Sequence, residues 1–411
     1  MNWEVDILDT HNLRFEGDFD AQVQDILSFV RLTADRVHNL RRLFDDLKQA
    51  LQHVAPGCNI EPFGSVVTGL GIKTSDVDCY IALPNGEQPH TGHVIRARNV
   101  LTRYHRKFSE IIAITTARVP IVKFLHIPTQ CQCDVNFKSP AGVRNSQLIA
   151  FLLQYDKRAL PLAVLIKYWS KVHKFTGTNL MGNYALIMML IFYLQLMNIL
   201  PSVYELQRNM PEYFVDGWNT AFDDSVTSSN TRNSDTLYEL LGGFFKCYST
   251  FNYKENMISP FLGRVINKKS FENFDIPEEF SLYKNQVTKD VRKKLKTDSK
   301  FCVQDPFEHN KNISVSIFDR LAERITSHFQ FASKKFEDEE STNFLRAIFT
   351  QDPHSAAAAP VNPKHKFNNK IKKRKQKNRG VPNQTGFRMM YNQYNQTIAK
   401  GNQNNSLKPE N

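Results

Sequence analysis

Two aspartates, Asp76 and Asp78, stand two residues apart at the start of an apolar run, within the stretch from Pro62 to Leu83. Successive side chains of a β-strand alternate between its faces, so the two carboxylates share one face with Tyr80. Side-by-side carboxylates repel each other unless a cation lies between them. Because oxygen-only ligands suit Mg²⁺ or Mn²⁺, the pattern indicates a divalent-cation site. Taken alone, however, most Asp-x-Asp pairs are surface turns or solvated strand ends.

A glycine-serine pair, Gly64 and Ser65, precedes these aspartates. Such a pair can expose backbone N–H groups at the start of a helix, where anions bind readily. A phosphate-binding turn beside a metal site with two carboxylates is the smallest set of groups that nucleotidyl transfer requires. In this order and at this spacing, the two features are much more specific than either one alone.

A third carboxylate follows downstream at Asp134. The segment Val119–Ile127 is typical of a strand, and Pro128 with Thr129 forms a turn before a returning strand over Cys131–Phe137. The alternation of that returning strand places Asp134 on its polar face. In isolation Asp134 would be a solvated strand residue, but with Asp76 and Asp78 upstream we expect it to complete a metal-binding triad.

Six motifs, in their order along the chain, resemble those of the non-canonical poly(A) polymerases and terminal uridylyltransferases, which belong to the DNA polymerase β-like nucleotidyltransferase superfamily. They are Phe63-Gly64-Ser65, Asp76-x-Asp78, Asp134-Val135-Asn136, Lys167-Tyr168-Trp169-x-Lys171, Asn183-Tyr184-Ala185 and Asp305-Pro306-Phe307-Glu308. The resemblance implies an α+β fold. It consists of a nucleotidyltransferase palm, in which a mixed sheet is backed by helices, and a mostly helical poly(A)-polymerase-associated domain.

The resemblance also implies a reaction, the template-independent addition of ribonucleotides from nucleoside triphosphates to RNA 3′-hydroxyls with two Mg²⁺ or Mn²⁺ ions. Asp76 and Asp78 would bridge both ions. Asp134 would hold the ion that lowers the pKa of the RNA 3′-hydroxyl. Ser65 and the backbone around Gly64 would cradle the β and γ phosphates.

Four further residues match family positions that bind the nucleotide. Lys167 and Lys171 lie four apart on one helix face and would contact the triphosphate, although a solvated basic stripe is the alternative. Asn145 matches the asparagine that contacts the ribose, and a helix cap is equally compatible with its sequence position. Tyr184 matches the tyrosine that stacks on the base, and without the resemblance it is an ordinary core aromatic residue.

The loop Asp305–Asn312 corresponds to the family segment that reaches the base edge. Uridylyltransferases typically carry a histidine three residues after the glutamate of this loop, whereas this chain has Lys311 there and His309 two residues early. Lys311 can donate to O4 of uracil, while Asp305 or Glu308 could accept a hydrogen bond from either uracil or adenine.

We therefore expect UTP to be modestly favoured over ATP. One alternative is that Lys311 points into solvent and the chain is an ATP-using poly(A) polymerase. Another is a non-catalytic RNA-binding member of the family, which the intact carboxylate triad disfavours.

Periodicity predicts the elements that position these residues. One apolar stripe predicts a helix over residues 20–54, and a second helix is expected over Arg96–Ala113. Two helices in succession are expected over Gln147–Tyr155 and Leu160–Phe175. The most apolar run, Tyr184–Leu200, is interrupted by polar residues and predicts a buried helix and no membrane span.

The predicted domains follow from these elements. Residues 1–19 form an N-terminal extension, and residues 20–140 form the catalytic palm with its leading helix. Residues 141–350 form the helical domain. Residues 351–411 form a linker and a disordered, basic tail.

The charge of the chain is concentrated in its tail. The 411 residues carry a formal net charge of +12, and residues 361–411 contain 12 Lys or Arg against one acid, Glu410. We expect this tail to act as a nuclear-localisation signal, an RNA tether or both. The six scattered cysteines predict reduced thiols, and the acidic N-terminus resembles neither a secretory nor a mitochondrial leader. The expected protein is a nuclear or cytoplasmic monomer that binds RNA and UTP or ATP, and an RNA-targeting protein partner could select its RNA.

Overall fold

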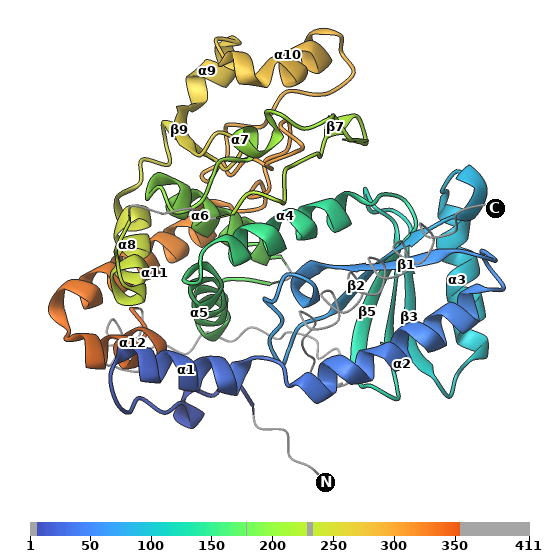
Figure 1. The fold of residues 1–411 in the computed structure, drawn as a ribbon, viewed down its shortest axis with the longest axis horizontal. Coiled ribbons are helices and arrows are strands. Elements are labelled where there is room, and N and C mark those ends of the chain that lie inside the picture. The colour runs from blue at the N-terminus through green and yellow to red at the C-terminus, as the bar shows by residue number, and fades with distance from the viewer. Residues whose placement is uncertain (1–5, 178, 228–232, 354–411) are drawn as a thin grey trace, which may run out of the picture.

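A computed structural model describes residues 6–177, 179–227 and 233–353 of the chain. The predicted linker and basic tail, residues 351–411, therefore lie outside the described residues, apart from the first three positions of the linker. Within the described ranges the structure is α+β, as expected: a five-stranded sheet lies at one end and a larger helical body at the other (Figure 1).

The sheet is mixed, and its strands run in the order β1-β2-β5-β4-β3. Strands β2 and β5 are parallel neighbours, whereas the other pairs are antiparallel. The bounds of the strands are β1 Asn59–Phe63, β2 Val77–Ala82, β3 Phe108–Ile114, β4 Ile121–His126 and β5 Cys131–Asn136. The strands expected around Asp78 and Asp134 therefore form, and both have the predicted alternation of buried and more exposed residues.

Helices α2 (Ala34–Leu51) and α3 (Thr91–Arg103) cover the apolar face of the sheet. The buried cluster between them takes side chains from β2 and β5, among them Cys79 and Cys133. All six cysteines are free thiols, as expected from their scattered spacing. The opposite face of β2 and β5 is left for the polar side chains of the candidate site.

The helical body buries a second and larger cluster. Trp169 lies at its centre, with ring centroids 5.0 Å from Phe175, 4.7 Å from Phe245 and 5.7 Å from Phe329. The long helices of this body are α1 Phe19–Val30, α4 Ala141–Tyr155, α5 Ala159–Val172, α6 Asn183–Leu196, α8 Leu237–Thr250, α11 Asp319–Asp338 and α12 Ser341–Thr350. Apart from its first two residues and its last one, α6 is buried, which agrees with its predicted place in the core.

Short elements complete the helical body. They are η1 Thr10–Asn12, α7 Val203–Gln207, α9 Lys268–Asn273, η4 Glu278–Phe280, α10 Ser281–Thr288, and the strand pairs β6 Phe214–Val215 with β7 Trp218–Asn219 and β8 Asn256–Ser259 with β9 Arg264–Asn267. Two further 3₁₀ turns, η2 Gly64–Val66 and η3 Pro84–Gly86, belong to the sheet half of the molecule. Among the helices of the described residues, none has the length and apolar character that a membrane span requires.

The single helix expected over residues 20–54 is wrong, because the chain breaks between α1 and α2. Arg31 forms an isolated bridge with Ile72, and the Val30 carbonyl accepts a hydrogen bond of 2.9 Å from the Lys73 backbone N–H. Thr33 then caps α2 through its side chain. The break sends the apolar residues of α1 into the helical core and those of α2 onto the sheet, although a single periodic stripe runs through both.

The helix expected over Arg96–Ala113 is also wrong in its second half. Helix α3 ends at Arg103, and the chain continues as the edge strand β3, which pairs antiparallel with β4. Three isoleucines in β3 favour a strand locally, and pairing with β4 outweighs the helical period of the preceding residues. Helix α4 begins at Ala141, six residues before the predicted start, directly after Pro140.

We predict that Gly242→Ala destabilises the helical body. A Cβ atom at Gly242 of α8 would overlap the ring of Phe336 on α11. Overpacking of this kind costs about 1–3 kcal/mol, only partly offset by a gain of about 1 kcal/mol in helix propensity. Thermal unfolding measures the change. Lys246→Ala is the matched control, because it removes only an exposed ion pair between the same two helices and should change stability by less than about 1 kcal/mol. Equal melting temperatures for the glycine variant and the wild type would contradict this account of the helix pair.

Candidate functional site

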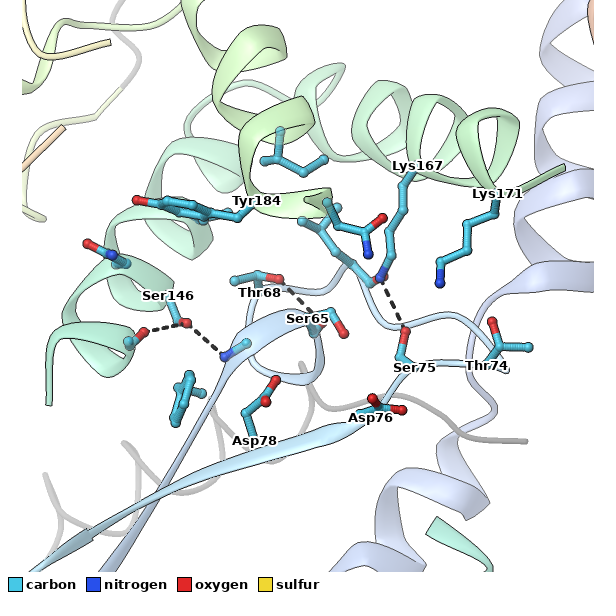
Figure 2. Close-up of a pocket in the computed structure, with 18 of the residues that line it drawn as sticks. Ser65, Thr68, Thr74, Ser75, Asp76, Asp78, Ser146, Lys167, Lys171 and Tyr184 are labelled. Carbon is cyan, nitrogen blue, oxygen red and sulfur yellow. Dashed lines mark hydrogen bonds between the residues drawn. The ribbon is translucent and has the colours of Figure 1, made fainter. Parts of the chain in front are cut away.

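A cavity of about 420 Å³ lies where the polar face of the sheet meets α4, α5 and α6. Figure 2 shows side chains from the sheet edge and from the helices pointing into it. Nine of the twelve predicted site residues line this cavity: Gly64, Ser65, Asp76, Asp78, Asn145, Lys167, Lys171, Tyr184 and Lys311. The other three, Asp134, Asp305 and Glu308, do not line it but contact residues around it.

Strand pairing brings two of the predicted carboxylates side by side. In the parallel pair of β2 and β5, Asp78 is in register with Asp134. Asp76 is exposed and immediately precedes β2. Burial, together with the negative charges of Asp134 and Asp76, raises the pKa of Asp78 to about 8. Without a cation, therefore, the three carboxylates do not all stay ionised near neutral pH, and Asp78 is the one that keeps its proton.

Asp134 is held by a lysine that the sequence analysis did not single out. Lys123 faces Asp134 across the antiparallel pair of β4 and β5, and its Nζ donates to Asp134 Oδ2 at 2.7 Å. Burial nevertheless raises the pKa of Asp134 above its usual value. The second oxygen, Oδ1, is buried without a hydrogen-bond partner. An unpaired carboxylate oxygen next to two other carboxylates fits the donor set of a hard divalent cation.

The Gly64 turn is positioned by close contact with the aspartates and with α4. Gly64 has φ = 79°, and a Cβ atom there would overlap Asp78 Oδ2, so no other residue fits at this approach. Its backbone N–H donates to Ser146 Oγ at 2.8 Å, and that hydroxyl donates to the Gly142 carbonyl at 2.7 Å. This N–H is therefore already used within the structure, because Ser146 accepts from it, and the phosphate contact of Ser65 and the rest of the turn remains a prediction.

The two predicted lysines share one face of α5, as their spacing implies, but differ in environment (Figure 2). Lys167 is buried, and its Nζ donates to the Leu70 carbonyl at 2.8 Å and to Ser75 Oγ at 3.2 Å. Burial, together with the positive charge of nearby Lys171, lowers the pKa of Lys167 to about 7. The alternative of a solvated basic stripe is excluded for Lys167. Lys171 is half-buried at the rim of the same cavity.

A second set of charges surrounds the other end of the cavity. Tyr184, at the start of α6, donates its hydroxyl to Asp305 Oδ2 at 3.3 Å. Lys311 Nζ lies 3.5 Å from the same oxygen and 3.3 Å from Glu308 Oε2. Burial lowers the pKa of Lys311, but the two carboxylates outweigh it and raise that pKa above its usual value. Lys311 is therefore a charged donor that lines the cavity and does not point freely into solvent.

His309 is not part of this cavity. It is 5% exposed and packs against Phe261, with ring centroids 4.1 Å apart, and against Trp218 and Phe280. Burial lowers the pKa of His309 to about 4, so it is a neutral core residue. The histidine that lies two residues early therefore does not replace the one that the family carries in this loop.

Asn145 lines the cavity from the second turn of α4 and is not the cap of that helix, because Pro140 occupies the cap position. Sequence reasoning missed three other residues of the site: Lys123, Ser146 and Ser75. Ser146 and Ser75 are marked by no local pattern, since their partners Gly64 and Lys167 lie 82 and 92 residues away in the chain. Only the strand pairing of Asp134 with its antiparallel neighbour, once assigned, would have pointed to Lys123.

Two family models match the chain. One, described as the central palm domain of mitochondrial-like poly(A) RNA polymerase, matches residues 19–154. The other, described as Cid1 family poly A polymerase, matches residues 236–311. The first covers the sheet with the helices around it, and the second covers the segment from α8 to the loop that carries Lys311.

The chain is similar to curated relatives of two kinds, some named poly(A) polymerases and others named terminal uridylyltransferases. A speckle targeted PIP5K1A-regulated poly(A) polymerase of Danio rerio is 26% identical over 83% of this chain and 49% of its own length. Terminal uridylyltransferase 7 of Homo sapiens is 28% identical over 69% of this chain and 18% of its own length. Terminal uridylyltransferase cid1 of Schizosaccharomyces pombe is 23% identical over 82% of this chain and 83% of its own length. The chain thus spans about half of the first relative and less than a fifth of the second.

Solved structures show the same fold. The crystal structure of mtPAP in complex with UTP has a TM-score of 0.69 and 22% identity, and covers 84% of this chain and 75% of that one. The Cid1 poly(U) polymerase bound to MgGTP has a TM-score of 0.66 and 21% identity, and covers 80% of this chain and 98% of that one.

We predict that Asp78→Asn stabilises the metal-free protein at pH 8 and above. The pKa of Asp78 is about 8 in the folded state and 3.8 for the isolated group, so folding becomes less favourable as pH rises from about 4 to about 8. The amide cannot ionise, so the variant avoids this loss. Thermal unfolding in a chelator should show a higher melting temperature for the variant at pH 8 and a smaller difference at pH 4.

Added Mg²⁺ should reverse the order at pH 8, because the cation stabilises only the ionised wild type. Asp45→Asn, on the exposed side of α2, is the matched control and should shift neither curve. A wild type that melts at the same temperature as Asp78→Asn at pH 8, with and without Mg²⁺, would show that this carboxylate is not under electrostatic strain.

Proposed function

The chain belongs to the family of poly(A) polymerases and terminal uridylyltransferases, and from that premise we propose that it adds ribonucleotides to RNA 3′-hydroxyls without a template. The observation that carries the proposal is the register of Asp78 with Asp134 across β2 and β5, beside Asp76 and at the wall of the cavity. Three clustered carboxylates next to two lysines provide opposite charges for a cation and a triphosphate.

Asp76, Asp78 and Asp134 would hold the Mg²⁺ or Mn²⁺ ions. The raised pKa of Asp78 and the unpaired Oδ1 of Asp134 both support this assignment. When bound, such ions neutralise phosphate charge and lower the pKa of an attacking hydroxyl. A site that is electrostatically strained without a cation is already arranged to receive one.

The remaining cavity residues divide between positioning and binding. Lys167 holds the segment that leads into β2, through Leu70 and Ser75, and it would also contribute positive charge toward the triphosphate. Lys171 and Ser65 would contact the β and γ phosphates. Asn145 would contact the ribose hydroxyls, and Tyr184 would stack on the base and is itself oriented by Asp305.

We favour UTP as the nucleotide. Lys311 is held at the cavity wall by Asp305 and Glu308, and an ammonium group there can donate to O4 of uracil. The N6 amino group of adenine has no lone pair to accept this donor and would face it unfavourably. The alternative is ATP, and relatives named as poly(A) polymerases support that alternative as directly as the named uridylyltransferases support UTP.

Partners follow from the same reaction. RNA is the acceptor, and we propose that a targeting protein or the basic tail, which lies outside the described residues, contributes to RNA selection. All proposed site residues come from one chain, which is compatible with action as a monomer. A nuclear or cytoplasmic location is the corresponding proposal.

We predict that the double variant Asp76→Ala, Asp78→Ala abolishes nucleotide incorporation. Loss of the cation site removes several kcal/mol of transition-state stabilisation, which corresponds to a rate loss on the order of 10³ or more. The assay extends a labelled single-stranded RNA primer with each ribonucleoside triphosphate separately, in Mg²⁺ or Mn²⁺. Asp45→Ala serves as the control for general effects of removing an acid. Full incorporation by the double variant would show that the site is elsewhere, and an inactive wild type would point to a required partner or a non-catalytic role.

We predict that Lys311→Ala reduces the ratio of UTP to ATP incorporation. A charge-assisted hydrogen bond contributes about 1.5–3 kcal/mol, so the ratio should fall on the order of tenfold or more. The same primer assay, run with mixed nucleotides at known ratios, measures this preference. Lys300→Ala, on an exposed lysine outside the cavity, is the control. A wild type that prefers ATP, together with an unchanged ratio in Lys311→Ala, would assign the chain to the adenylyl-transferring alternative.

A further inference from the structure

A second cluster of metal-ligating side chains lies away from the nucleotide cavity, at the start of α3. Glu87, His90 and His93 each place one ligand atom within 4.8 Å of those of the other two. They recur every third residue, where η3 leads into α3, and form a carboxylate and two imidazoles. No residue of this cluster lines the cavity of the candidate active site.

We propose that Glu87, His90 and His93 bind one first-row transition-metal ion of the Zn²⁺ class. Two imidazole nitrogens and one carboxylate oxygen form a donor set that suits Zn²⁺ and disfavours Mg²⁺, which takes oxygen ligands and waters. Glu87 and His90 are exposed, so a solvent molecule can complete the coordination. This site does not rest on the proposed nucleotidyl transfer.

His93 has the surroundings of a metal ligand. Its side chain is fully buried, and its ring stacks on Phe137 with centroids 5.7 Å apart and lies 4.1 Å from the ring of His90. Its Nδ1 accepts from the His90 backbone N–H at 3.3 Å and lies 3.3 Å from the carbonyl oxygen of the same residue. With an ion on Nε2, the ring proton would lie on Nδ1, which would then donate to that carbonyl, as the second nitrogen of a metal-bound histidine usually does.

The Nε2 atom of His93 already points at a ligand. It lies 2.9 Å from Glu87 Oε1, and a proton must sit between these two atoms when no ion is bound. A metal ion would replace that proton and bring the nitrogen and the carboxylate oxygen into one coordination shell. The ring proton of the neutral imidazole would then lie on Nδ1, which faces the His90 carbonyl.

His90 currently uses Nδ1 as a helix cap, accepting from the Gly92 backbone N–H at 3.1 Å. Histidines at both positions of a capping box are unusual, because serine or threonine with glutamate fills these roles in most helices. A neutral imidazole has only one unprotonated nitrogen, so as a metal ligand His90 would give up this cap whichever ring nitrogen bound the ion. A cap alone does not require an imidazole, whereas Zn²⁺ sites commonly use one.

Positive charges near the cluster oppose the ion only weakly. Arg96 Nη2 is 4.0 Å from Glu87 Oε1 and is half exposed. Lys138 lines the small cavity of about 220 Å³ next to His90, but its Nζ donates to the Arg118 carbonyl at 2.7 Å. The N-terminal end of the α3 dipole also disfavours a cation slightly. Three direct ligands outweigh these screened, exposed charges.

The test is a titration of the full, tag-free chain with Co²⁺ in excess Mg²⁺, so that carboxylate-only sites are already filled. A visible absorption band of the bound Co²⁺ then reports a site that has nitrogen ligands and a low coordination number. The expected result is one equivalent of Co²⁺ with a visible band that Zn²⁺ displaces.

Two variants separate metal binding from helix capping. His90→Asn keeps an excellent cap but removes the imidazole, and Glu87→Gln replaces an exposed carboxylate with an amide. Each should weaken Co²⁺ binding at least tenfold and leave thermal unfolding in chelator unchanged. His105→Asn, on another exposed histidine, is the matched control and should bind like the wild type. No visible band in the wild type, or an equal band in all four proteins, would overturn the proposal.

Discussion

Repulsion between neighbouring carboxylates is the constraint on which the candidate site depends. The parallel pairing of β2 and β5 fixes Asp78 next to Asp134, and burial of their common face prevents water from screening the charge. Such an arrangement needs a proton or a counter-charge to offset the repulsion. Lys123 provides part of the counter-charge through Asp134, and a bound cation would supply the rest.

The elements around these carboxylates pack closely against them. Gly64 must lack a side chain because the turn passes directly over Asp78, and Ser146 on α4 holds the turn in place. Lys167 reaches from α5 to the segment just before β2. The helical body thereby contacts the sheet at the points where the charges are concentrated, and carboxylates lie close to lysines at both ends of the cavity.

Much of this could be predicted from the sequence, because period-2 alternation is strong in β2 and β5 and places Asp78 and Asp134 correctly on their polar faces. The errors have physical causes. The stripe through residues 20–54 hides a break that exists because Arg31 pairs with Ile72, a contact that no local pattern records. Strand β3 was predicted as part of the helix before it, because the helical period was expected to continue. It forms a strand because it pairs with β4.

Within the site, the residues that the motifs mark were placed at the cavity, whereas their partners were not. Ser146 and Lys123 matter through what they contact, and those contacts come from tertiary packing. The donor role of Lys311 could be predicted from its side-chain chemistry. Its environment could not, since the carboxylates that restrain it are brought to it by the folded loop. His309 shows the converse, because a residue type suggestive of function is a packed core side chain.

The ion pair between Arg118 and Glu308 joins the loop before β4 to the loop that carries Lys311, across 190 residues of chain. Contacts between such distant segments form late in folding, because the intervening chain must be ordered before they are gained. The ion pair is also exposed on its arginine side, which favours its opening in local fluctuations. The part of the cavity that Lys311 lines is therefore completed only after segments far apart in the chain have come together.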